Sequence, residues 1–240
     1  MGKCKNANRA ILVLEAPWEM DSEDSNRTSV LPFVEGVAKF AGDTEVYLAN
    51  FYDKSSFGKA LDCLCKTKFL NTIVYIAAHG YEGKVQGIKL LEALSAVASK
   101  SKAYNITGVL LGSCYVGENV TTMQACIEDS NLRWCVGYSS SSYWLSGTMI
   151  DTAILAKMSQ LDDDEFKSRD LIVNYFAEAL SPFSLTFPVG KDYEEVQVRL
   201  QDSIRFVVQP SGKGKQAKDV TLDVLREHWN CQLADVEDDA

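Results

Sequence analysis

Short apolar runs alternate with amphipathic segments along the first two thirds of the chain. The apolar runs are rich in Val, Ile, Leu and Tyr, as buried strands are, and lie at 10–14, 44–51, 71–78, 106–112 and 133–138. Between and after them, apolar residues recur at helical spacing over 30–40, 56–69, 90–97, 116–127 and 144–158. This alternation predicts a three-layer α/β/α fold around a mostly parallel sheet, because the connections are long enough for right-handed crossovers.

The last third of the chain has a less regular pattern. Helical spacing predicts helices over 162–180 and 220–229, and alternation over 196–208 predicts a hairpin or an edge strand. Neither an internal repeat nor a clear domain boundary is visible. We therefore expect one domain over 1–240, with a core at about 9–158 and a C-terminal extension, 161–240, of unassigned role.

Charge and composition indicate which classes of binding partner the protein is not expected to have. Lys and Arg number 24 against 33 Asp and Glu, a net charge of −9, which repels phosphate backbones and anionic lipid; we expect neither nucleic acid nor a membrane as partner. The amino end lacks the apolar core of a secretory signal. The sequence has seven cysteines, an odd number, so they cannot all pair in disulfides within one chain. Because a secretory signal is also missing, we expect reduced thiols and a cytoplasmic protein.

The basic run Lys213–Lys218 is short and follows Pro210. Its Gly and Lys content predicts a solvated loop. An exposed basic loop over 210–218 is also a candidate site of self-cleavage.

Two of the predicted strands end in reactive residues. His79-Gly80 follows the third apolar run, and Gly112-Ser113-Cys114 ends the fourth. Consecutive strands of an α/β fold are neighbours about two times in three. Ligands bind at the carboxyl ends of such strands, so we expect His79 and Cys114 to face one another across one crevice. A helix starting near Val116 would add a partial positive charge that favours the thiolate of Cys114.

These residue types fit covalent catalysis. A thiolate attacks a carbonyl carbon, and an imidazole can protonate the departing amine. The backbone N–H groups of Gly80 and Cys114 would hold the developing oxyanion. Competing motifs are absent from the sequence: it contains neither a dinucleotide-binding or P-loop glycine pattern nor a serine-hydrolase elbow.

A structural zinc site is an alternative use for some of the cysteines. Its four ligands would be Cys63, Cys65, His228 and Cys231. Their spacing differs from the usual zinc patterns, and both pairs fall in predicted helices. We expect instead that Cys63, Cys65, Cys126 and Cys135 are buried as small hydrophobes. For His228 we expect a partly exposed surface position.

The motifs Ile76-Ala-Ala-His79-Gly80 and Val109-Leu-Leu-Gly-Ser-Cys114-Tyr-Val-Gly117 resemble those of the caspase-like cysteine peptidases, and above all of their bacterial CHAT-type branch. The run Trp134-Cys-Val-Gly137-Tyr-Ser is similar to the next strand of that family, and the resemblance covers about 9–158 in element order. It implies a cysteine endopeptidase that uses His79 and Cys114, forms an acyl-enzyme and needs no metal or organic cofactor. It also implies a protein or peptide substrate, an activating protein partner and a role as a triggered effector in stress or phage defence.

One position departs from the family pattern. The residue two before the cysteine is polar or charged in caspases and helps to read the P1 side chain, but here it is Gly112, so no acidic or basic preference carries over. The candidate substrate-binding residues are Gly112 and the residues that end or follow neighbouring strands, namely Glu15, Asp21, Tyr138, Ser139 and Ser140. A cleft lined by Glu15 and Asp21 would favour Lys or Arg at P1.

Two other functions stay open on the sequence alone. A catalytically inactive relative would keep the fold and bind a partner protein, and the unusual Gly112 leaves room for this. A flavodoxin-like domain would bind a small molecule, with His79 and Cys114 merely lining the crevice.

Overall fold

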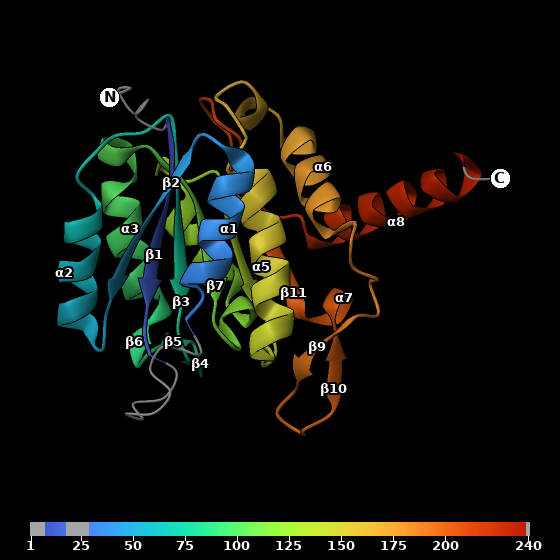
Figure 1. Cartoon of the computed structure of the whole chain (residues 1–240), viewed down its shortest axis with the longest axis horizontal. Coiled ribbons are helices and arrows are strands. Elements are labelled where there is room, and N and C mark those ends of the chain that lie inside the picture. Colours follow the sequence, from blue (N-terminus) through green and yellow to red (C-terminus); the bar gives the residue numbers. More distant parts are fainter. Residues whose placement is uncertain (1–7, 18–28, 239–240) are drawn as a thin grey trace.

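The computed structural model of the chain describes residues 8–17 and 29–238, with side chains up to residue 230. In this part of the chain a seven-stranded sheet has the order β12-β11-β8-β7-β3-β1-β2 (Figure 1). Its parallel strands are β1 (Arg9–Glu15), β2 (Thr44–Asn50), β3 (Asn71–Ala77), β7 (Ile106–Gly112) and β8 (Trp134–Tyr138). At one edge β11 (Ile204–Val208) pairs antiparallel with β8, and the short β12 (Lys218–Asp219) pairs antiparallel with β11.

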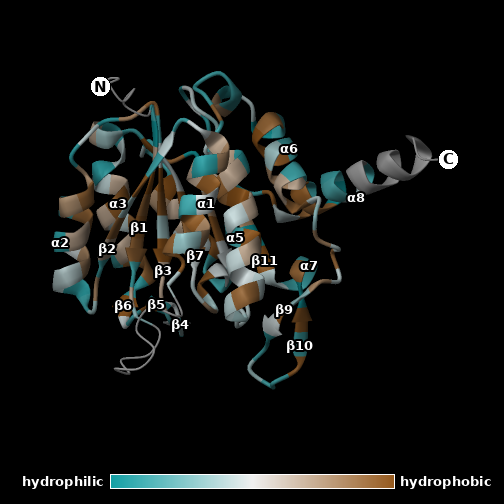
Figure 2. Ribbon diagram, viewed as in Figure 1, coloured by the Kyte–Doolittle hydropathy of each residue, from teal (hydrophilic) through white to brown (hydrophobic). Residues whose placement is uncertain are grey.

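Helices cover both faces of this sheet. One layer contains α1 (Leu31–Ala41), α5 (Trp144–Met158), α6 (Arg169–Leu180) and the start of α8 (Thr221–Asp238). The other contains α2 (Lys54–Leu64), α3 (Leu90–Tyr104) and α4 (Val120–Ile127). Successive residues of β1 enter opposite cores, Ile11 the first and Leu12 the second. Figure 2 accordingly shows the hydrophobic colours gathered on the strands between the helices. The predicted three-layer fold with a mostly parallel sheet is confirmed.

Several small elements complete the fold at its edges. After β3 come the two-residue strands β4 (Gly80–Tyr81), β5 (Lys84–Val85) and β6 (Ile88–Lys89), and the hairpin β9 (Pro188–Lys191) with β10 (Gln197–Arg199) leads into α7 (Leu200–Ser203). The region predicted to alternate over 196–208 thus divides between this hairpin and β11. The predicted helix over 56–69 is too long, since α2 ends at Leu64. None of the described helices is long and apolar enough to cross a lipid bilayer.

Two predictions about single residues are wrong. His228 is completely buried, and its Nε2 lies 2.9 Å from the carbonyl oxygen of Phe183. Cys63 is exposed, whereas Cys65, Cys126 and Cys135 are buried as expected. No group of three or more His, Cys, Asp or Glu side chains suited to a metal ion occurs among the described residues, and the side chain of Cys231 lies outside them.

Candidate active site

The ends of β3 and β7 bring the two predicted reactive segments together. These strands are parallel neighbours, and their register places Ala77 beside Gly112. His79 and Cys114 each follow two residues later, at the same edge of the sheet. A Cβ atom on Gly80 would lie 2.7 Å from the backbone nitrogen of Cys114 and closer still to its carbonyl oxygen. Only glycine therefore lets the segment after β3 approach the backbone of Cys114 so closely.

Cys114 carries a half-buried, free thiol. The backbone N–H of Ser142 donates a hydrogen bond to its Sγ over 3.3 Å. Burial raises the pKa of the Cys114 thiol, and the N–H groups of Ser142 and of Cys114 itself oppose this rise only in part. The thiol of the resting protein is therefore neutral at pH 7.

The predicted helix end beside the sulfur is not found. A 3₁₀ turn occupies Val116–Glu118, and α4 begins only at Val120. α4 thus begins six residues beyond Cys114, and the groups that lower the pKa of the thiol are the N–H groups of Ser142 and of Cys114 itself. Burial consequently decides the direction of the pKa shift.

This direction predicts how the thiol reacts. Alkylation of Cys114 by iodoacetamide should keep accelerating up to a higher pH than alkylation of a cysteine model peptide, because the thiolate forms later. Mass spectrometry of the peptide that contains Cys114, sampled over time at several pH values, measures the rate. A rate that levels off at lower pH than that of the model peptide would contradict the burial argument.

Tyr115 holds the segment after the cysteine in an uncommon conformation. Its φ angle is +60°, in the left-handed region that non-glycine residues rarely adopt. Its backbone N–H donates to the carbonyl oxygen of Ser140 over 2.9 Å. Together with the bond from Ser142 to the sulfur, this contact fixes Cys114 against the serine loop, residues 139–142, that follows β8. Strained residues of this kind are concentrated at functional sites.

Glu15 has a structural contact instead of an open position. It is 6% exposed, and its carboxylate accepts hydrogen bonds from Ser29 Oγ (2.8 Å) and from the backbone N–H of Val30 (2.7 Å). Burial raises the pKa of Glu15, and these two bonds partly offset the rise. The side chain anchors the entry to α1, so it is not presented to a substrate. Asp21, the other predicted acidic reader, lies outside the described residues.

Behind Gly112 lies a buried carboxyl group that sequence reasoning missed. Asp151 of α5 is 2% exposed, and the hydroxyls of Tyr75 and Tyr138 donate to its two oxygens over 2.7 and 2.6 Å. Burial raises the pKa of Asp151 to about 7. A Cβ atom on Gly112 would lie 2.7 Å from Asp151 Oδ2, so glycine is required and this acid occupies the side-chain space.

The signal for Asp151 was present in the sequence. It is the acidic residue on a helical face otherwise formed by Gly147, Ile150, Ile154 and Leu155. A carboxyl group on an apolar face must find buried partners. Neither tyrosine partner was predictable, because both come from distant strands.

The predicted readers that end or follow β8 are bonded within the protein. Tyr138 is buried and bonded to Asp151. Ser140 is 2% exposed, with its Oγ 2.6 Å from Ser203 Oγ, and Ser139 Oγ donates to the carbonyl oxygen of Ser203 over 2.9 Å. The side chains of Ser139 and Ser140 therefore attach the serine loop to the end of α7.

A cluster of three tyrosines, two of them exposed, flanks the site. Tyr81, Tyr115 and Tyr193 come from three distant segments, and the rings of Tyr115 and Tyr193 are stacked with their centroids 4.2 Å apart. Tyr81 packs edge-on against both at 6.4 and 6.3 Å. The hairpin that carries Tyr193 is held by a bond from the backbone N–H of Ser141 to the carbonyl oxygen of Lys191 (2.9 Å). A cavity of about 310 Å³ beside the cluster is lined by His79, Gly80, Tyr81, Lys84, Gln86 and Gly87.

Comparison with known proteins finds a distant structural likeness but no sequence match. No protein-family model matches the sequence, and no curated protein matches it. Among solved structures, the chain is similar to iotapain, a secreted C11 cysteine protease of Bacteroides thetaiotaomicron, with a TM-score of 0.49 and 11% identity over 84% of this chain and 67% of that chain. At this TM-score and identity the likeness says nothing about the function of this chain.

Proposed function

We propose that this protein is a caspase-like cysteine endopeptidase in which Cys114 is the nucleophile and His79 the general acid and base. The contact of Gly80 with the backbone of Cys114 carries the proposal, since it joins the His and Cys segments at one edge of paired strands. A free, half-buried thiol and an exposed histidine at the same edge of the sheet fit acyl transfer.

The chemical steps follow from a thiol that is neutral at rest. His79 takes the proton of Cys114 as Sγ bonds to the carbonyl carbon of the scissile peptide, while the N–H groups of Gly80 and Cys114 stabilise the oxyanion. The C–N bond then breaks as His79 gives the proton to the departing amine, which leaves a thioester. Water attacks the thioester carbonyl, passing a proton to His79, and the acid and the thiol are released.

The substrate groove would run past the tyrosine cluster, in which the exposed rings of Tyr81 and Tyr193 offer apolar contact area. The sequence predicted a preference for Lys or Arg at P1 because Glu15 and Asp21 would line the cleft. Since the carboxylate of Glu15 is bonded within the protein, Asp21 is the remaining acidic residue that would bind such a side chain. The cytoplasmic location, the activating partner and the role in defence stay predictions.

Mass spectrometry of a digested proteome tests the proposal. Incubation with the wild-type protein should create new peptide termini, and the Cys114→Ala variant should create none. The exposed Cys63 supplies a control, because Cys63→Ala should cut as the wild type does. Equal cleavage by wild type and Cys114→Ala would remove Cys114 from the mechanism, and termini that follow Asp or bulky apolar residues would reject the basic P1 preference.

A further inference from the structure

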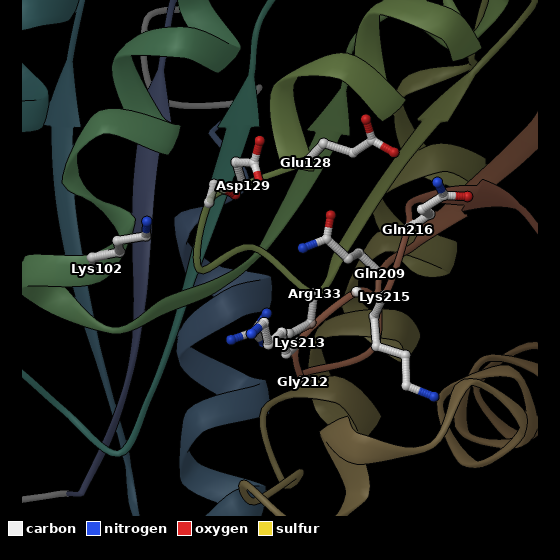
Figure 3. Close-up of a pocket in the computed structure, with 11 residues that line it drawn as sticks. Lys102, Glu128, Asp129, Arg133, Gln209, Gly212, Lys213, Lys215 and Gln216 are labelled. Atoms are coloured by element: carbon white, nitrogen blue, oxygen red, sulfur yellow. The ribbon is translucent and has the colours of Figure 1, made fainter.

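A second cavity lies at the edge of the sheet opposite Cys114. It measures about 600 Å³ and is lined by the end of α3, the residues between α4 and β8, and the loop after β11 (Figure 3). Arg133 immediately precedes β8 and Lys102 is near the end of α3, so both mark the amino-terminal ends of parallel strands. The site is therefore separate from the one proposed for peptide cleavage.

Positive charge dominates this cavity in an acidic protein. Four cationic side chains line it, Lys102, Arg133, Lys213 and Lys215, against the carboxylates Glu128 and Asp129. Glu128 accepts a hydrogen bond from the backbone N–H of Ala217 over 3.3 Å. Within the described part of the chain, none of the four cations forms an ion pair. A chain with a net charge of −9 thus keeps a group of cations without salt bridges in one hollow, where only the more distant charge of Asp163 acts on Arg133.

Two partly desolvated groups form the inner wall. Arg133 is half-buried, and burial lowers its pKa; its Nη2 donates to Asn131 Oδ1 over 3.1 Å. Gln209 is 6% exposed, and its Oε1 has no hydrogen-bond partner. The backbone N–H of Gln209 donates to the carbonyl oxygen of Arg133 over 2.8 Å, and Figure 3 shows the two side chains next to one another. A buried acceptor without a donor is costly unless a ligand supplies one.

The basic loop, predicted to be merely solvated, forms the outer wall. Its ends are held by bonds from the N–H of Ser211 to the carbonyl oxygen of Phe166 (2.7 Å) and from Arg169 Nη2 to that of Gln216 (2.7 Å). Gly212 and Gly214, with φ angles of +126° and +76°, flank Lys213. Such turns expose backbone N–H groups that can bind an anion. Lys215 directs its ammonium group away from Arg133 (Figure 3). The cations available to bind an anion in the cavity are therefore Lys102, Arg133 and Lys213.

We propose that this cavity binds a small phosphate ester of the mononucleotide class. The guanidinium of Arg133 matches phosphate oxygens in pairs, and the two lysines add charge. The Gln209 Oε1 requires a hydroxyl or amino donor, which the ribose and base of a nucleotide supply in addition to the phosphate that the cations bind. The volume suits one such molecule.

Isothermal titration calorimetry of the full chain tests this site with ADP, adenosine and pyrophosphate. EDTA in the buffer prevents a metal ion from bridging ADP to Glu128 and Asp129. ADP should bind with a Kd below about 1 mM, more tightly than pyrophosphate, and adenosine should bind far more weakly. Lys102→Gln and Lys213→Gln, both at exposed positions, should each weaken ADP about tenfold.

Lys218→Gln is the matched control. Lys218 is exposed in the same basic run but does not line the cavity, so the variant loses the same charge and should bind ADP as the wild type does. Three results would each overturn the proposal: no binding of ADP, adenosine bound as tightly as ADP, or equal weakening in Lys218→Gln and Lys213→Gln. Pyrophosphate bound as tightly as ADP would overturn the assignment of an ester with a donor. None of these results depends on peptidase activity.

Discussion

Alanine at Cys114 is expected to lower kcat/KM for peptide cleavage by about 10³-fold or more, and alanine at His79 by a similar factor. The first variant removes the atom that forms the acyl-enzyme. The second leaves a neutral thiol whose proton has no acceptor, since burial raises the pKa of Cys114. The assay is the cleavage rate of a peptide copied from a site found in the proteome digest.

The double variant sharpens this prediction. Residues that act as one unit lose their contribution together, so His79→Ala combined with Cys114→Ala should be no slower than the slower single variant. Cys63→Ala, which changes an exposed thiol on α2, should retain full activity. If the losses of the two single variants multiplied in the double variant, His79 and Cys114 would act independently, which the dyad does not allow.

Asp151 should make the stability of the protein fall as pH rises from about 4 to about 7. In the unfolded chain this carboxyl group titrates near 3.8, whereas in the folded protein burial raises its pKa to about 7. Between these values the folded protein holds a proton that the unfolded chain has lost, so a rising pH favours unfolding. This loss in the free energy of unfolding is absent below pH 4, grows by about 1.4 kcal/mol per pH unit and reaches about 4 kcal/mol above pH 7.

Asp151→Asn is the variant that isolates this effect. Asparagine has the shape of the protonated acid and cannot ionise, so its hydrogen bonds with Tyr75 and Tyr138 can persist at every pH. Urea unfolding of both proteins at several pH values gives the difference in free energy of unfolding. The free energy of unfolding of the variant should rise relative to that of the wild type as pH rises. If the free energies of unfolding of the two proteins changed with pH in parallel, Asp151 would be ionised in the folded protein already at low pH. Other titrating groups, such as Glu15, cancel in the comparison.

The hydrophobic pattern was enough to predict the layers and most of the elements. Burial on both faces leaves a nearly continuous apolar run in each parallel strand, and this signal is local. Boundaries were less accurate where a helix stops without a strong signal, as at Leu64, or where a 3₁₀ turn precedes a helix, as at Val116–Glu118. The sequence also marked His79, Gly80 and Cys114 as residues at strand ends.

The tertiary structure decided what surrounds those residues. The pairing of β3 with β7 puts Gly80 against Cys114, and the packing of α5 puts the carboxyl group of Asp151 in the side-chain space of Gly112. Tyr193 reaches the site from a hairpin in the region that the sequence left unassigned. Such contacts join segments far apart in the chain, and no local periodicity records them. The sequence by itself therefore determined the layers and the candidate dyad, whereas the burial of Cys114 and the loss of Glu15 as a substrate reader followed only from packing.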